Sequence, residues 1–303
     1  MTDSDQPLDA RVALVAGGTR GAGRGIAVEL GAAGATVYVT GRSTRTSRSD
    51  MDRPETIEET AELVTAAGGT GIAIACDHTD PSQVGALAAV VRAESGRLDI
   101  LVNDVWGGDP LTEWDVPFWK LDLAKFRVLW ERAVLSHVIT SSYAVPLMLE
   151  CGSGLIVEVT DGVGTDYRGN LAYDLVKNAV NRLALAQAEE LRPHGIVALA
   201  VTPGFLRSEA VLDVFGVTEA NWRDGARKDP HFAASETPRF VGRAVAALAA
   251  DPAVASRAGQ VLTSWDLARE YDLVDVDGSR PDWGRHFAEN VTGVAKDSAA
   301  PTS

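Results

Sequence analysis

The sequence predicts an α/β fold: a doubly wound parallel sheet of about seven strands with helices on both faces. Short apolar segments rich in β-branched residues alternate with helical segments of roughly 10 to 20 residues, a pattern typical of parallel sheets covered on both sides. A glycine-rich turn at residues 17–23 joins the first strand to the first helix. We expect the connections between parallel strands to be right-handed.

The elements follow one another in a regular order along the chain. The first strand is apolar and runs into the glycine turn, and the second (TVYVT) is rich in β-branched and aromatic residues. The first helix turns Ile26, Ala27 and Leu30 inward. Strands are expected at 11–16, 36–40, 71–76, 100–103, 155–160, 196–201 and 260–263. Helices are expected at 24–33, 54–67, 81–95, 121–149 and 172–191.

The composition predicts one domain over residues 1–303 and disfavours several classes of protein. A hydrophobic content of 46% is enough for a substantial core. A net charge of −14, from 28 basic and 42 acidic residues, disfavours a nucleic-acid surface. No apolar run approaches the roughly 20 residues that span a bilayer, so we expect a cytoplasmic protein without a membrane partner. Cys76 and Cys151 lie far apart without metal-ligand spacing, which predicts reduced thiols and no zinc site.

Two segments fall outside the alternation of strands and helices. Residues 205–238 have mixed polarity and scattered aromatic side chains, and they follow the end of a strand, where doubly wound sheets bind ligands. They are the expected substrate lid. Residues 266–303 form a polar C-terminal extension, of which a part is expected to dock on the domain and residues 296–303 are expected to be disordered.

Two motifs carry the chemistry. Gly17, Gly21 and Gly23 permit a tight turn and let backbone amides approach a pyrophosphate, which the N-terminus of the following helix also favours. Alone this signal is weak, because a generic glycine-rich turn looks the same. Tyr173 and Lys177 lie four residues apart on one helix face, so the ammonium can lie near the phenol and lower its pKa. Together the motifs predict a proton donor beside a nucleotide site.

In the spacing of these glycines and in the Tyr173/Lys177 pair, residues 10–265 resemble the short-chain dehydrogenase/reductase family. The resemblance implies a Rossmann fold and an oxidoreductase in which Tyr173 donates a proton to a carbonyl oxygen as hydride arrives from a nicotinamide. Lys177 would lower the pKa of the tyrosine and bind the nicotinamide ribose. The partners it implies are a small-molecule substrate and further copies of the chain, in a homodimer or homotetramer.

The end of the second strand predicts NADP(H) rather than NAD as the cofactor. Folds that prefer the unphosphorylated dinucleotide place an acid there to hold the ribose hydroxyls. Here the position is Gly41, followed by Arg42, so no carboxylate repels a 2′-phosphate. Arg20 in the glycine turn and Arg42 can together pair with that phosphate, although either arginine alone could be a solvated loop charge.

The resemblance implies further cofactor contacts at the ends of other strands. Asp77 would hydrogen-bond the adenine amino group, although it could instead be a helix N-cap, a role that Asp80 before Pro81 fills more naturally. Asn103 matches the family's Asn-Asn-Ala-Gly motif, whereas the next three residues depart from it. Ser208 stands where a threonine often binds the carboxamide. The predicted cofactor-binding residues are Gly17, Thr19, Arg20, Gly21, Gly23, Arg42, Asp77, His78, Asn103, Tyr173, Lys177, Pro203, Gly204 and Ser208.

The clearest departure from the family is Asp161, which stands 12 residues before Tyr173 in place of a serine that donates a hydrogen bond to the carbonyl. An ionised carboxylate only accepts hydrogen bonds and would oppose a forming alkoxide. Three interpretations stay open. Asp161 is a protonated donor in a buried setting, or it stabilises a cationic substrate such as an iminium, or carbonyl chemistry is weak or lost. We favour a reductase with a modified site, with Tyr173, Lys177 and Asp161 as its catalytic residues.

Two further departures concern the long fourth helix and the loop before it. Counting back from Pro146 places Ala133 where the family has a proton-relay asparagine, so Glu131, His137 or a water on the lysine would have to replace it. His137 also has a simpler interpretation as a helix-face histidine. Trp106 and Trp114 are expected at the substrate pocket, which suggests a bulky aromatic or polycyclic substrate, while the neighbouring aromatic residues pack the helix. The alternatives to an NADP(H)-dependent carbonyl reductase are an imine reductase and a non-catalytic NADP-binding protein.

Overall fold

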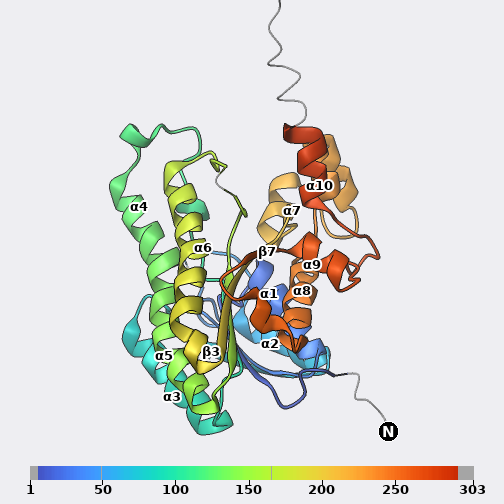
Figure 1. Cartoon of the computed structure of the whole chain (residues 1–303). Coiled ribbons are helices and arrows are strands. Elements are labelled where there is room, and N and C mark those ends of the chain that lie inside the picture. The colour runs from blue at the N-terminus through green and yellow to red at the C-terminus, as the bar shows by residue number, and fades with distance from the viewer. Residues whose placement is uncertain (1–5, 49, 165, 293–303) are drawn as a thin grey trace, which may run out of the picture.

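The computed structural model describes residues 6–48, 50–164 and 166–292. They form a seven-stranded parallel sheet in the order β3-β2-β1-β4-β5-β6-β7, with helices on both faces (Figure 1). The strand order reverses at β1, because β2 and β3 extend the sheet to one side and β4 to β7 to the other. Such a reversal opens a crevice at the carboxyl ends of β1 and β4. The predicted doubly wound sheet is therefore confirmed.

The strands lie within one or two residues of their predicted positions. The first and the seventh strands are each one residue shorter than expected, and all three residues of the seventh pair with β6. The strands are β1 (Val12–Ala16), β2 (Thr36–Gly41), β3 (Thr70–Ala75), β4 (Ile100–Asn103), β5 (Gly154–Val159), β6 (Ile196–Thr202) and β7 (Val261–Thr263).

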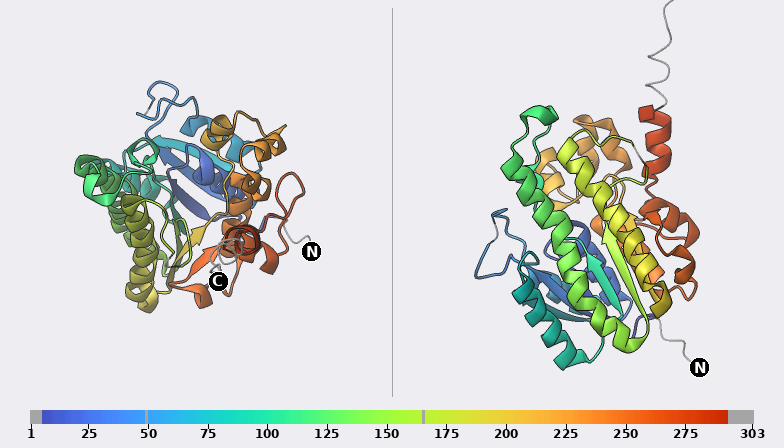
Figure 2. Two further views of the ribbon diagram at one scale, coloured as in Figure 1. Left: turned by 90° about the horizontal axis from the view of Figure 1, so that it is seen from above. Right: turned by 60° about the vertical axis from the view of Figure 1, so that its left-hand side comes forward.

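The helices pack in two layers, which Figure 2 shows from above on either side of the sheet. One layer contains α1 (Gly21–Ala32), α2 (Ile57–Ala66), α8 (Pro238–Ala250) and α9 (Ser264–Glu270). The other contains α3 (Pro81–Ser95), α5 (Ser136–Cys151) and α6 (Leu171–Leu191). Alternate side chains of β1 supply both cores: Ala13 and Val15 pack with α1, whereas Val12 and Leu14 pack with α3 and α5. The predicted inward residues Ile26, Ala27 and Leu30 are buried.

The predicted fourth helix is one continuous segment with a local defect. It consists of α4 (Leu123–Trp130), a π-helical turn (Glu131–Leu135) and α5. Leu123–Cys151 is long and apolar enough to cross a membrane by length and composition, which differs from the expectation that no segment would be. In this fold the segment packs along the sheet and α6, with Leu129 and Met148 buried, as a core helix does.

The predicted lid and extension are both partly helical and contact each other. The lid contains α7 (Glu209–Phe215) and two 3₁₀ segments (Trp222–Arg227 and Pro230–Ala234), and the extension contains α10 (Trp283–Phe287). In Figure 1 they lie together above the sheet. Trp283 packs edge-to-face on Phe205 at a centroid distance of 5.5 Å. The part of the extension predicted to be disordered, residues 296–303, lies outside the described residues.

Buried polar side chains fix the start of α8 beneath the lid. Arg207 donates to the Ser235 carbonyl at 2.7 Å and lies 3.9 Å from the Trp222 ring centroid. Glu236 accepts from the Gly204 amide at 2.9 Å and from the Ser264 hydroxyl at 2.6 Å. Its other oxygen has no hydrogen-bond partner among the described residues. Burial raises the pKa of the Glu236 carboxyl from 4.5 to about 8, so it is largely protonated at neutral pH.

Glu236 should make stability decline as pH rises. The unfolded chain releases this proton near its ordinary pKa of 4.5, whereas the folded chain holds it until about pH 8. Raising the pH between these values therefore favours the unfolded state, and Glu236→Gln, which cannot ionise, removes that loss. The measurement is the free energy of unfolding in urea, for Glu236→Gln and for wild type at pH 5.5 and pH 8. We expect the variant's advantage over wild type to be larger at pH 8 than at pH 5.5 by at least about 1 kcal/mol.

The matched control is Glu190→Gln, which removes an exposed carboxylate from α6. Its difference from wild type should be the same at the two pH values. An equally pH-independent difference for Glu236→Gln would show that the buried carboxyl is not protonated in the folded protein.

Candidate active site

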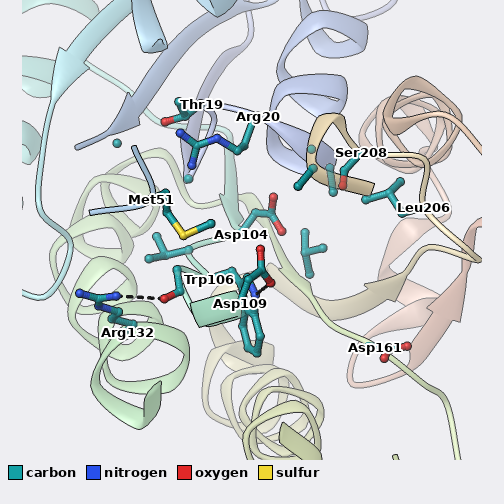
Figure 3. A pocket seen from close by; sticks show the side chains of 18 of the residues that line it. Thr19, Arg20, Met51, Asp104, Trp106, Asp109, Arg132, Asp161, Leu206 and Ser208 are labelled. Carbon is teal, nitrogen blue, oxygen red and sulfur yellow. Dashed lines mark hydrogen bonds between the residues drawn. The ribbon is translucent and has the colours of Figure 1, made fainter. Parts of the chain in front are cut away.

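A cleft of about 540 Å³ lies at the carboxyl ends of the central strands. Figure 3 shows it in close-up, with Arg20 and Trp106 on different walls and Asp104 between them. The glycine turn, the ends of β2 to β6 and the lid all contribute to its lining. Of the predicted site residues, all but Gly23 and Asn103 line this cleft. The residues that the sequence analysis singled out are thus brought together in space.

The glycine turn is packed so closely that side chains would not fit. A Cβ on Gly17 would lie 2.4 Å from the Asp104 carbonyl oxygen, and Gly17 has a φ of 88°. A Cβ on Gly23 would lie 2.4 Å from the Gly17 carbonyl oxygen. The turn therefore presses on the loop after β4, and the first amides of α1 face the cleft. A cradle of this shape fits a dinucleotide pyrophosphate.

Two carboxylates accept hydrogen bonds from those amides. Glu209, on α7, accepts from the Gly21 amide at 2.8 Å, and Asp104 accepts from the Gly23 amide at 2.5 Å. Desolvation raises the pKa of Asp104 to about 7, while the Lys177 ammonium acts in the opposite direction. The sequence analysis identified neither carboxylate as a ligand of this turn, since each approaches it from a distant segment. A bound pyrophosphate would compete with Glu209 for the Gly21 amide.

The predicted 2′-phosphate arginines lie at the opposite end of the glycine turn. Arg20 pairs with Glu55 at 3.1 Å and donates to the Ser43 hydroxyl at 3.3 Å. Arg42 pairs with Asp50 at 2.8 Å, and Asp50 also pairs with Arg132 at 2.6 Å. The three arginines line the cleft. Guanidinium groups in this arrangement can hold a phosphate, and Arg132 is a member that the sequence analysis missed.

Tyr173 lies in the first turn of α6, where Asn170 caps the helix by accepting from the Ala172 and Tyr173 amides. Its hydroxyl donates to Asp161 at 2.7 Å. Arg168 Nη2 lies 2.6 Å from both oxygens of the same carboxylate. Because Tyr173 and Arg168 both donate hydrogen bonds to Asp161, its carboxyl group acts as an acceptor. The interpretation of Asp161 as a protonated donor is therefore not supported. Arg168 is a site residue that the sequence analysis missed.

The lysine does not act on the phenol as expected. Lys177 Nζ lies 4.2 Å from the Trp106 ring centroid and 5.6 Å from that of Tyr173. Burial, and then the charge of Asp161 and the hydrogen bond to it, raise the pKa of Tyr173 above its ordinary value. Burial also lowers the pKa of Lys177. The prediction of a lowered phenol pKa is wrong for this arrangement, because a carboxylate contacts the hydroxyl and the ammonium does not.

Aromatic rings enclose the phenol on two sides. Trp106 lies edge-to-face on Tyr173 at a centroid distance of 5.4 Å, and Trp114 lies at 5.2 Å. Trp106 is held by a 2.6 Å hydrogen bond from its indole to Asp109. Trp106 lines the cleft, in agreement with its expected place in the substrate pocket, whereas Trp114 is not among the residues that line the cleft and is 53% exposed. Trp119 is instead largely exposed, so it does not pack the long helix as expected.

A buried polar network supports the loop after β4, and the sequence analysis missed its centre. Glu158 accepts from the Asn103 amide group at 2.9 Å and lies 2.7 Å from His137 Nδ1. The other ring nitrogen of His137 lies 3.1 Å from the Val105 carbonyl oxygen. His137 is therefore a buried residue on a face of α5, in agreement with its simpler interpretation, and both of its ring nitrogens are engaged by other groups. The sequence did show a glutamate inside an otherwise apolar strand, which was the available signal.

The structure also shows where the other two positions considered for the proton relay, Ala133 and Glu131, lie. Ala133 is buried in an apolar cluster with Val176 and Val180, so it cannot hold a water by a side-chain hydrogen bond. Glu131 pairs with Arg127 on the helix surface at 3.1 Å. The π-helical turn Glu131–Leu135 lies at this point of the helix, and such turns occur frequently at functional sites.

The other predicted cofactor contacts, Asp77, His78 and Ser208, also line the cleft. Asp80 caps α3, as expected, while Asp77 accepts from Thr79. The ring nitrogens of His78 contact Thr40 and Thr140, and burial lowers its pKa to about 4, so the ring is neutral. Ser208 caps α7 by accepting from the Val211 amide. The side chain of His78 is thus directed into the core rather than toward a ligand.

Comparison with known proteins agrees with this geometry. The family model of short chain dehydrogenases matches residues 11–215. Mouse dehydrogenase/reductase SDR family member 1 is 36% identical over 90% of this chain and 85% of its own length. A 7α-hydroxysteroid dehydrogenase structure with NADH and 7-oxo glycochenodeoxycholic acid is 26% identical, with a TM-score of 0.70 over 92% of this chain and 99% of that one. An NADP-bound putative gluconate 5-dehydrogenase from Beutenbergia cavernae is 25% identical, with a TM-score of 0.68 over 86% and 97%.

Replacing Glu209 by glutamine should strengthen dinucleotide binding. The change removes a negative charge from the Gly21 amide that a pyrophosphate would use, so we expect the Kd for NADPH to fall about three- to tenfold. Titration followed by NADPH fluorescence measures this. Asp213→Asn is the matched control, because it removes the same charge from α7 but contacts Arg53 instead of the glycine turn. A Kd that is unchanged in Glu209→Gln would show that this carboxylate does not compete with the cofactor.

Proposed function

The chain belongs to the short-chain dehydrogenase family, and we propose that it is an NADP(H)-dependent oxidoreductase that reduces a bulky apolar carbonyl compound, with Tyr173 as the proton donor. The observation that carries the proposal is the position of Tyr173, which lines the same cleft as the glycine cradle and whose ring packs against Trp106 and Trp114. In this family the bound nicotinamide supplies or accepts the hydride.

The surroundings of Tyr173 favour reduction over alcohol oxidation. Because burial and Asp161 raise its pKa, the phenol stays protonated across the physiological pH range and can give a proton to a developing alkoxide. Oxidation would need the phenolate, which the same neighbours disfavour. Lys177, above the Trp106 ring, places a cation close to where a ribose would lie and helps to hold that indole.

Support for NADP(H) comes from the arginines at the end of β2. Position 41, at the end of β2, carries no carboxylate, and Arg20 and Arg42 each pair with an acidic residue of the loop after β2. A 2′-phosphate would add to these ion pairs or exchange with Asp50, which is about half-exposed.

Support for a bulky apolar substrate comes from the walls of the cleft. Trp106 lines the cleft beside Tyr173, and Phe205, Leu206 and Trp283 line it from the lid and the extension. Flat rings of this kind suit a polycyclic ketone. The steroid-like ligand of the 7α-hydroxysteroid dehydrogenase structure belongs to the same chemical class.

We also propose a cytoplasmic homo-oligomer. Exposed apolar side chains lie along the outer surface of α4, α5 and α6, among them Trp130, Leu135, Val138 and Leu175. These helices stand side by side in both views of the molecule (Figures 1 and 2). Exposed apolar side chains on neighbouring helices are typical of a contact between subunits. The partner that we propose for this surface is a second copy of the chain.

Tyr173→Phe tests the central role. The substitution keeps the ring between the tryptophans and removes only the hydroxyl, so NADPH should still bind while turnover falls at least about 100-fold. The assay follows NADPH consumption against a panel of ketones, aldehydes, quinones and cyclic imines. Tyr143→Phe, on the surface of α5, is the matched control and should retain full activity. Turnover by Tyr173→Phe at the wild-type rate would contradict the proposal.

Arg42→Ala tests the cofactor. Loss of one charge-assisted contact to a 2′-phosphate should raise the Kd for NADPH about tenfold and leave the Kd for NADH within about twofold. Arg45→Ala is the control, because Arg45 lies in the same loop but pairs with Glu62, and it does not line the cleft. An equal effect of Arg42→Ala on both dinucleotides would remove the argument for NADP(H).

A further inference from the structure

Asp161 leaves the active site without its usual hydrogen-bond donor. The carboxylate accepts from Tyr173 and from Arg168, so no proton on it is available to a substrate. Alone, its charge would oppose the formation of an alkoxide a few ångströms away. Any carbonyl reduction in this cleft therefore needs a second group that donates a hydrogen bond and cancels that charge.

Arg168 meets both requirements. Its guanidinium is always charged and carries five N–H groups, of which Nη2 contacts Asp161. The side chains of the pair remain 32% and 28% exposed, and both residues line the cleft, so neither is closed off from a ligand. Arg168 Nε is buried without a hydrogen-bond partner among the described residues.

The local backbone holds Arg168 in this position. The Arg168 amide donates to Asp174 at 3.0 Å, which ties the loop to the first turn of α6 beside Tyr173. Gly162, with a φ of 87°, turns the chain away immediately after Asp161, and the Arg168 side chain packs 3.6 Å from where a Cβ on Gly162 would lie. These contacts tie Arg168 to the first turn of α6 and place it beside Gly162, next to Asp161.

We propose that Arg168 replaces the missing serine as the donor to the substrate's carbonyl oxygen, and that by neutralising Asp161 it makes the site select neutral carbonyl compounds over cationic iminium ions. This inference rests on the proposed function as a reductase. The inference adds whether the site prefers neutral or cationic substrates, a preference that reductase activity by itself does not determine.

The step balances with the groups named. A bound NADPH would supply the hydride: its C–H bond would break as a C–H bond forms at the carbonyl carbon, leaving NADP⁺, and the π electrons would move to the oxygen. The Tyr173 O–H bond breaks as its proton moves to that oxygen, which leaves a phenolate that solvent reprotonates. Arg168 stabilises the negative charge on the oxygen during the transfer. An iminium ion is positively charged before the hydride is transferred. An unpaired Asp161 carboxylate would therefore stabilise it in the site, whereas the Asp161–Arg168 ion pair, with a net charge of zero, would not.

The experiment compares two bicyclic ligands of matched shape, neutral 1-tetralone and the N-methyl-3,4-dihydroisoquinolinium cation. Their Kd values are measured by quenching of tryptophan fluorescence in the presence of saturating NADP⁺, and their turnover is measured with NADPH. The variants are Arg168→Met, Arg168→Lys, Asp161→Ser and the double variant Asp161→Ser/Arg168→Met. Arg127→Met removes an exposed arginine of α4 outside the cleft and controls for net charge.

We expect wild type, Arg168→Lys and Arg127→Met to prefer the ketone. Arg168→Met should shift the ratio of the two Kd values at least about tenfold toward the cation, because Asp161 is then unpaired. The double variant should lose that preference and regain ketone turnover relative to Arg168→Met, since it lacks both charges. If Arg168→Met does not fold, Asp161→Ser tests the proposal, because it leaves Arg168 unpaired and should shift the ratio of the two Kd values further toward the ketone than in wild type.

Two outcomes would overturn the assignment of Arg168. One is a ligand ratio in Arg168→Met within threefold of wild type, and the other is the absence of binding of either ligand to wild type. Failure of the proposed function looks different. In that case wild type would bind the ketone, and the ratio of the two Kd values would still shift in the variants. Wild type would nevertheless consume no NADPH with any carbonyl or imine.

Discussion

The contact between the glycine turn and the loop after β4 is the constraint on which the site depends. With Gly17 and Gly23 packed at distances that no Cβ would tolerate, the first turn of α1 and the backbone of Asp104 are fixed against each other. That contact directs the amides of Gly21 and Gly23 into the crevice where the sheet changes direction. Because β1 and β4 are neighbours in the sheet, the dinucleotide cradle and the loop that carries Trp106 share one rigid support.

The loop after β4 is held from beneath by charge buried inside the sheet. Glu158 and Asn103 are opposite one another in β5 and β4, and the glutamate also contacts His137 from the long helix. Gln187 of α6 donates to the same carboxylate at 3.0 Å. A buried carboxylate is costly unless its oxygens are satisfied, and here three side chains from separate elements satisfy them. The network therefore joins the two helices to the strands whose ends form the cleft.

The sequence predicted those features that follow from local patterns. The alternation of apolar and helical segments predicted the sheet, and Pro81 after Asp80 predicted the start of α3. The spacing of Tyr173 and Lys177 predicted which face of α6 points to the site. What it could not predict depends on contacts between distant segments. Arg168 reaches Asp161 across a loop, and Glu209 reaches Gly21 from 188 positions away. The pKa of the Tyr173 phenol is set first by its burial and then by the charged group that contacts its oxygen. A spacing of four placed Lys177 on the right face but said nothing of where its flexible chain would end.

The charge of the cleft opposes that of the whole chain, and the local charge decides what binds. A net charge of −14 would repel a dinucleotide at long range, yet screening at physiological ionic strength limits that repulsion to about 8 Å. At shorter range the charges of the cleft itself act on a ligand, and Arg20, Arg42, Arg132, Lys177 and Arg168 all line the cleft. Each has an acidic partner or neighbour, so the cleft is arranged as oriented ion pairs instead of a free positive patch. An anionic ligand gains most where it takes over the cation from such a partner, which restricts binding to ligands whose negative groups match the spacing of the arginines.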